Sequence, residues 1–145
     1  MTQASLTPSP KWFSVVAVLA LIWNLLGVMA FISQIMMTPE MIEEMPKAQQ
    51  TLYQDIPLWA NAAFAVAVIA GTLGCVLLLL KKVLANTLFV LSLLGILVQN
   101  YHAFFIADAI GALGMTSIIM PLIVCLVAIA LILFASKAEQ KHWLG

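Results

Sequence analysis

The residues best suited to bind a ligand form a short polar run, Gln99–His102, at the end of an apolar stretch. Successive residues of an α-helix are about 100° apart, which places Gln99 and His102 on one face. Ser92 and Gly95 lie on that same face. Polar side chains are costly in an apolar environment unless they find partners. We therefore expect Gln99 and His102 either to line a polar pocket or to tie helices together through hydrogen bonds.

Other polar side chains are placed where they could complete such a pocket. Asn24 lies near the middle of the first apolar stretch, Gln34 lies just beyond its end, and acids gather in the connecting segments. A few convergent polar groups in a helix bundle are typical of a small-molecule site. The candidate ligand-binding residues are Asn24, Gln34, Asp55, Gln99, His102 and Asp108. For Asn24, a hydrogen-bonded clamp between helices is the alternative interpretation.

The sequence argues against catalytic, metal and cofactor chemistry. No carboxylate lies within an apolar stretch, as ion-coupled export usually requires. Cys75 and Cys125 form no CxxC motif, and His102 is the one histidine in an apolar stretch. Ser92 lies ten residues from His102 on one helix, too far for a nucleophile–base pair. We expect no enzyme, no catalytic residue, no metal site and no cofactor.

The composition predicts that these residues are held by membrane-spanning helices. Hydrophobic residues make up 64% of the chain and charged residues 8%, against about half and about a quarter in soluble domains. Four apolar stretches are each at least as long as the about 20 residues that a helix needs to cross a bilayer. They are 12–33, 58–80, 83–106 and 115–136. We predict an all-α integral membrane four-helix bundle that forms a single domain over 1–145. The zero net charge gives no reason to expect nucleic acid as a partner.

Small residues predict how the four helices pack. In the second stretch they recur every three or four positions, at Ala60, Ala63, Ala67, Ala70, Gly71 and Gly74. Helices in lipid associate by close approach of their backbones along such faces. We expect this alanine–glycine face to be a helix-packing surface.

The distribution of lysine predicts the orientation. Five lysines fall on one side of the predicted spans and one on the other: Lys11, Lys81, Lys82, Lys137 and Lys141 against Lys47. Lysine-rich segments stay cytoplasmic. Both termini are therefore expected in the cytoplasm, with the outer loop 34–57 and the candidate pocket on the opposite side.

The sequence of the outer loop, 34–57, predicts a short amphipathic surface helix. Thr38–Glu40 has the order of an N-cap, a proline at the first helical position and an acid in the first turn. Methionines four residues apart give the segment an apolar stripe. Pro46 interrupts it, after which Lys47–Tyr53 could continue the helix for another turn or two. This helix is expected to rest on the bilayer surface, and a lid or a docking surface for a partner is the alternative.

Several segments together resemble a poorly characterised family of small four-span bacterial inner-membrane proteins. They are Trp23–Val28, Thr38–Glu40, Pro57, Trp59, Gly71–Cys75 with the leucine run into Lys81 and Lys82, Leu88–Gly95 and His142–Leu144. The resemblance covers nearly the whole chain and implies a multi-pass protein of the bacterial inner membrane. Some members are labelled sugar transporters, but this sequence has no sugar-site signature.

Two functions remain open from the sequence. The low polar content of the spans favours an accessory or scaffold subunit that docks on a larger membrane complex. The polar outer end of the third span favours a small oligomeric transporter or solute-binding bundle with a polar pocket near the outer leaflet. In both, the lipid bilayer is the first partner.

Overall fold

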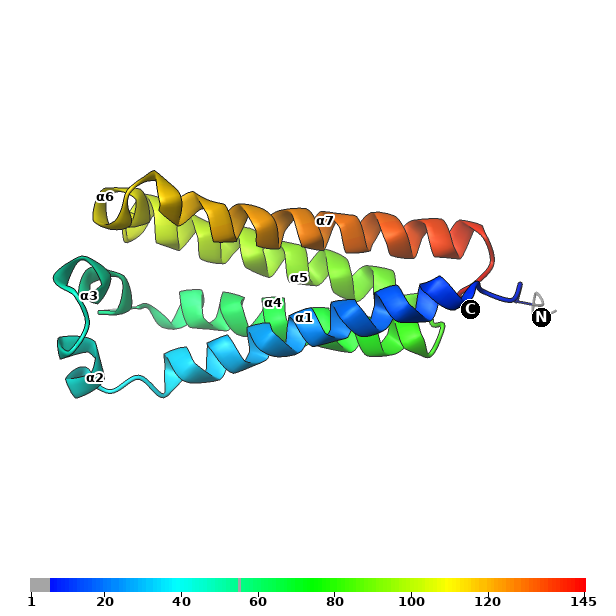
Figure 1. The fold of residues 1–145 in the computed structure, drawn as a ribbon, viewed down its shortest axis with the longest axis horizontal. Helices are drawn as coiled ribbons and strands as arrows, with labels where there is room; N and C mark the ends of the chain where they lie inside the picture. The colour runs from blue at the N-terminus through cyan, green and yellow to red at the C-terminus, as the bar shows by residue number, and fades with distance from the viewer. Residues whose placement is uncertain (1–5, 55) are drawn as a thin grey trace.

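The structure is a computed structural model that describes residues 6–54 and 56–145, which form helices joined by turns and short irregular segments, with no strand among them. Four long helices dominate (Figure 1): α1 (Lys11–Ile35), α4 (Leu58–Leu79), α5 (Leu84–Tyr101) and α7 (Ile119–Gln140). A π-helical turn, η1 (His102–Ile106), extends α5, and a 3-10 turn, η2 (Met115–Ile118), precedes α7. All four are long and apolar enough to cross a membrane. The all-helical class and the four apolar helices predicted from the sequence are confirmed.

Three short helices lie at one end of the long ones: α2 (Pro39–Glu43), α3 (Lys47–Tyr53) and α6 (Ala109–Leu113). The N-cap predicted at Thr38 is present, because its hydroxyl accepts a hydrogen bond of 3.3 Å from the Met41 amide. The outer loop holds two short helices, α2 before Pro46 and α3 in the segment where a further turn or two was possible from the sequence. Pro46 separates them, since its ring nitrogen has no hydrogen to continue the first helix.

The long helices pack in chain order. α4 packs against both α1 and α5, and α5 packs against α7. The small residues of α4 make this possible, because all six members of the alanine–glycine face are buried. On α5, Gly95 lies so close to α4 that an added Cβ would come within 2.7 Å of the Ala63 carbonyl oxygen and 2.9 Å of the Ala67 nitrogen. Glycine at 95 therefore sets the separation of these two helices.

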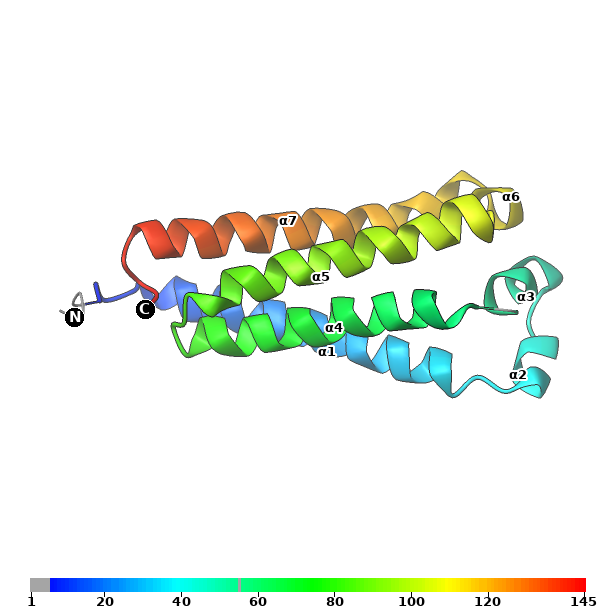
Figure 2. The ribbon, with the colours of Figure 1, turned by 180° about the vertical axis from the view of Figure 1, so that it is seen from behind.

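The end of the chain is fastened to the turn between α4 and α5. The Val83 amide donates to the Gly145 carbonyl at 3.0 Å, and the Gly145 amide donates to the Lys81 carbonyl at 2.8 Å. Trp143 is buried and meets the ring of Phe13 edge-on, with centroids 5.6 Å apart. As Figure 2 shows, α1 begins and α7 ends beside the α4–α5 turn, with the three short helices at the opposite end.

Candidate functional site

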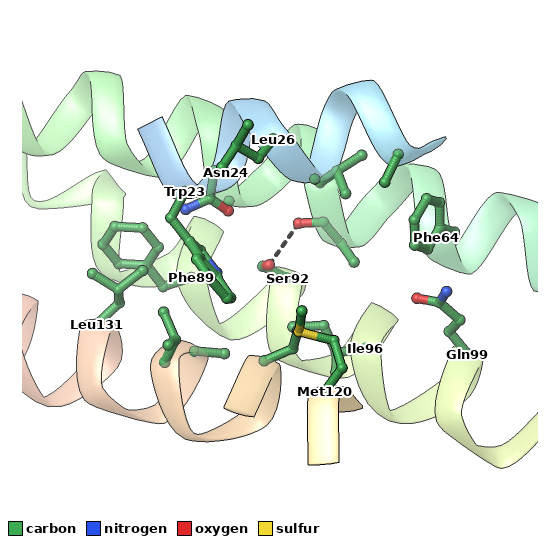
Figure 3. A pocket seen from close by; sticks show the side chains of 18 residues that line it. Trp23, Asn24, Leu26, Phe64, Phe89, Ser92, Ile96, Gln99, Met120 and Leu131 are labelled. Carbon is green, nitrogen blue, oxygen red and sulfur yellow. Dashed lines mark hydrogen bonds between the residues drawn. The ribbon is translucent and has the colours of Figure 1, made fainter. Parts of the chain in front are cut away.

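A cavity of about 340 Å³ lies among the four long helices and is lined by side chains from all of them. Figure 3 shows its length: Phe89 and Leu131 lie at one end, Phe64 and Gln99 at the other, and Asn24 lies between them. The closed end is well packed, since Phe89 is 1% exposed. The Gln99 end points toward the short helices.

The cavity opens to the surface between α1 and α7. Leu26 and Met120, which line it from these two helices, are 57% and 61% exposed. The two helices meet near the chain ends, where the rings of Phe13 and Phe134 stack with centroids 5.3 Å apart. From there α1 and α7 diverge toward the short helices (Figures 1 and 2). The opening therefore faces sideways, along the flank of the helices.

The wall of the cavity is mainly apolar. Of the described residues that line it, none is acidic, basic or histidine, and the amide and hydroxyl side chains among them are Asn24, Ser92 and Gln99. Trp23 adds an indole ring close to Asn24. Such a space suits an apolar molecule, because a charged group would lose its hydration there without gaining a partner.

Asn24 links α1 to α4. Its side-chain Nδ2 donates to the Ala20 carbonyl at 2.9 Å and to the Cys75 sulfur at 3.4 Å. Its Oδ1 lies against Gly71, where any Cβ would overlap it. Because both amide hydrogens of Asn24 are already donated to protein acceptors, the main role of this side chain is to connect α1 to α4 by hydrogen bonding.

Ser92 links α5 to α4. Its hydroxyl donates a hydrogen bond of 2.6 Å to the Ala67 carbonyl, and the residue is 6% exposed. The bond is drawn in Figure 3 and forms part of the cavity floor. The Ser92 hydroxyl proton is thus donated within the protein and is not available to a ligand.

Gln99 is the third polar side chain and differs from the other two. Within the part of the chain that the structure describes, its amide has no hydrogen-bond partner. It lines the cavity from α5 at the end near the short helices. Gln99 therefore offers both a donor and an acceptor to the cavity.

Three other predicted site residues lie elsewhere. Gln34 donates from Nε2 to Asn61 Oδ1 at 2.8 Å and so joins α1 to α4. His102 is buried beside Trp59, with ring centroids 5.5 Å apart and planes at 83°. Asp108 accepts from the Gly111 amide at 3.1 Å as the N-cap of α6.

The structure thus brings Asn24 and Gln99 to one cavity and leaves Gln34, His102 and Asp108 outside its wall. Asp55, the remaining predicted site residue, lies outside the described residues. The sequence predicts a polar pocket near the loops, whereas this cavity is mainly apolar and reaches the middle of the helices.

Sequence reasoning did not predict the apolar residues of the wall. Trp23, Phe64, Ile96 and Met120 look in the sequence like any other lipid-facing or packing residue. The one available signal was Trp23 beside Asn24, a large ring next to a polar group in mid-span.

No family model, curated protein or solved structure matches this chain. The fold and the cavity therefore define the class by themselves: an all-helical protein with four membrane-length helices around a side-opening apolar cavity.

Proposed function

We propose that this chain is a membrane-embedded binding protein that takes up a small apolar molecule from the bilayer. The observation that carries the proposal is the cavity between α1, α4, α5 and α7. Its volume of about 340 Å³ falls within the about 300–1,000 Å³ of typical small-molecule sites. Apolar cavities of smaller size stay dry and bind apolar molecules.

Insertion of the four long helices in a bilayer is part of the proposal. Large apolar side chains are exposed along the whole length of α1, from Val15 to Ile35, and along α7 from Ile119 to Leu133. Lipid is the solvent that covers such a surface without cost. The sideways opening of the cavity would then face the hydrocarbon, from which an apolar ligand enters directly.

We further propose that the ends of α1 and α7 that meet the α4–α5 turn are cytoplasmic. All five lysines of the lysine-rich side lie at this end of the molecule, whereas Lys47 lies with the short helices at the other. The positive-inside rule favours this orientation. The resemblance to small inner-membrane proteins supports the bacterial inner membrane as the location.

The cavity also favours ligand binding over the accessory or scaffold role. A subunit that only docks on a larger complex gains nothing from a space of this size, because an empty cavity lowers the stability of the helices around it. Purification without cross-linking discriminates between the two roles. A stoichiometric protein partner that accompanies the chain would support the accessory role.

Ligand-dependent stabilisation tests the proposed function. A ligand that binds only the folded protein stabilises it by about 2.7 kcal/mol at a hundredfold excess over its Kd. We expect a medium-chain alkane to raise the unfolding temperature of the wild-type protein in a lipid nanodisc.

Two alanines provide the matched variants for this test. Ala30 lines the cavity and is exposed, so Ala30→Phe places a ring in its opening, whereas Ala62 is exposed on α4 outside the cavity wall. The alkane should stabilise Ala62→Phe and not Ala30→Phe. Equal stabilisation of both variants, or none of the wild type, would refute the binding role.

A further inference from the structure

We infer that the cavity takes a single-chain neutral amphiphile, with its hydroxyl or carbonyl group at Gln99 and its alkyl chain directed toward Phe89. This inference rests on the proposed binding function and adds the class and the direction of the ligand. Three features of the cavity carry it: its shape, its lack of charge and the free amide at one end.

The shape favours a slender molecule. Phe89 and Gln99 mark the two ends of the cavity and lie ten residues apart on α5. At about 1.5 Å per residue the cavity is roughly 15 Å long. A volume of about 340 Å³ spread over that length leaves a narrow space, which suits one extended chain better than a broad ring system.

The absence of charge favours a neutral head group. None of the described residues that line the cavity carries a charge that could form an ion pair with a phosphate, a carboxylate or an ammonium group. An ion held there would lose its hydration without compensation. The head group is therefore one that forms hydrogen bonds without carrying a charge.

The polar side chains give the ligand its direction. Asn24 and Ser92 already donate to Ala20, Cys75 and Ala67. Gln99 keeps both its donor and its acceptor free, and it lies at the end nearer the short helices (Figure 3). An alcohol or ester can accept from its amide nitrogen, and an alcohol can also donate to its amide oxygen. The apolar end at Phe89 then receives the chain.

Quenching of Trp23 fluorescence by bromine measures both the affinity of a brominated ligand and its direction in the cavity. Trp23 reports direction because it lines the cavity near Asn24, away from Gln99. The probes are a bromoalkane and a bromoalkanol of one chain length, added to the full chain in nanodiscs. The Trp23→Phe variant supplies the signal of the other three tryptophans for subtraction. We expect the alcohol to bind about fivefold more tightly than the alkane, the value of one hydrogen bond.

The direction is tested by moving the bromine. An alkanol with bromine on its terminal carbon should quench Trp23 more strongly than one with bromine next to the hydroxyl. The reverse order would place the head group at the Phe89 end and overturn the inference.

The role of Gln99 is tested by substitution. Gln99→Leu and the unbranched Gln99→Met should both lose the fivefold preference for the alcohol while they still bind the alkane. Asn100→Leu is the matched control, because Asn100 donates to Cys125 at 3.3 Å and does not line the cavity. It should keep the preference.

The outcomes separate this inference from the proposed function. Equal binding of alcohol and alkane to the wild type overturns the inference and leaves the binding function intact. Saturable quenching by neither probe refutes both. Tighter binding of the matching alkyl phosphate or alkyltrimethylammonium overturns the neutral head group and indicates a lipid whose charged head stays outside the cavity.

Discussion

The Ser92 hydroxyl on α5 donates a 2.6 Å hydrogen bond to the backbone carbonyl of Ala67 on α4. The bond crosses between two helices at a point where both line the cavity. It holds the floor of the site while leaving no free hydroxyl proton for a ligand.

Removal of this bond should lower the stability of the helix bundle. Hydrogen bonds between membrane helices contribute about 0.6 kcal/mol on average and up to about 1.7 kcal/mol. We expect Ser92→Ala to lower the free energy of unfolding in detergent by about 1 kcal/mol. Thr72→Ala is the control, because Thr72 donates to Val68 within its own helix at 2.7 Å. A loss in Ser92→Ala no larger than that in Thr72→Ala would show that the Ser92 bond adds nothing to the stability of the packed helices.

Gly95 should tolerate no side chain at all. An added Cβ meets the backbone of Ala63 and Ala67, which cannot move aside without separating α4 from α5. Overpacking costs about 1–3 kcal/mol, so Gly95→Ala should lower the unfolding temperature.

Gly27→Ala is the control variant for Gly95→Ala, because it makes the same substitution on another long helix. A Cβ there meets a side-chain methyl of Val68, at 3.2 Å, and alanine gains about 1 kcal/mol of helix propensity over glycine. It should be neutral or stabilising in the same thermal unfolding measurement. If Gly95→Ala were equally well tolerated, the close approach of α4 and α5 would be wrong.

Much of the fold could be predicted from the sequence, because its signals are local. The apolar length of each span and the three- and four-residue spacing of small residues on 58–80 depend on a single helix. The cavity depends instead on the angle between α1 and α7, which lie far apart in the chain. Ile96 lines the cavity and Leu97 is 51% exposed beside it, yet the two residues look alike in a sequence.

The candidate site was predictable only in part, for a related reason. Gln99 and His102 do share a face of α5, because the His102 amide still donates to the Val98 carbonyl as in a regular α-helix. They differ in their position along the helix axis: Gln99 lines the cavity, whereas His102, about one turn further on, packs beside Trp59. Helix periodicity gives the face of a residue, but a sequence does not show where along that face a cavity ends.

Trp143 should hold the end of the chain against the α4–α5 turn. It is 8% exposed and packs against Phe13. Loss of a buried tryptophan side chain costs about 3–5 kcal/mol. In Trp143→Ala we expect faster hydrogen exchange at the Val83 amide, which donates to the Gly145 carbonyl.

Lys141→Ala serves as the comparison for Trp143→Ala. The Lys141 ammonium lies 5.1 Å from the centroid of the Trp143 ring, a contact worth about 0.5–1 kcal/mol at an exposed site. Exchange at Val83 should change little in this variant. Unchanged exchange in Trp143→Ala as well would mean that the tail is not fastened through this side chain.

The proposed orientation predicts which surface positions a reagent outside the cell can reach. Gln49 and Gln140 are exposed at opposite ends of the molecule. In a background without Cys75 and Cys125, an impermeant thiol reagent should label Gln49→Cys in intact cells and label Gln140→Cys only after the membrane is opened. The opposite pattern would invert the topology.

Photolabelling with a diazirine-tagged alkane in nanodiscs tests the central claim, that an apolar molecule occupies the cavity. Mass spectrometry then locates the labelled residues. We predict saturable labelling within 23–30 and 120–131, the segments of α1 and α7 that line the cavity, and its loss with excess untagged alkane. Labelling spread evenly over exposed residues such as Leu19, Ile69 and Leu133, without competition, would contradict the account.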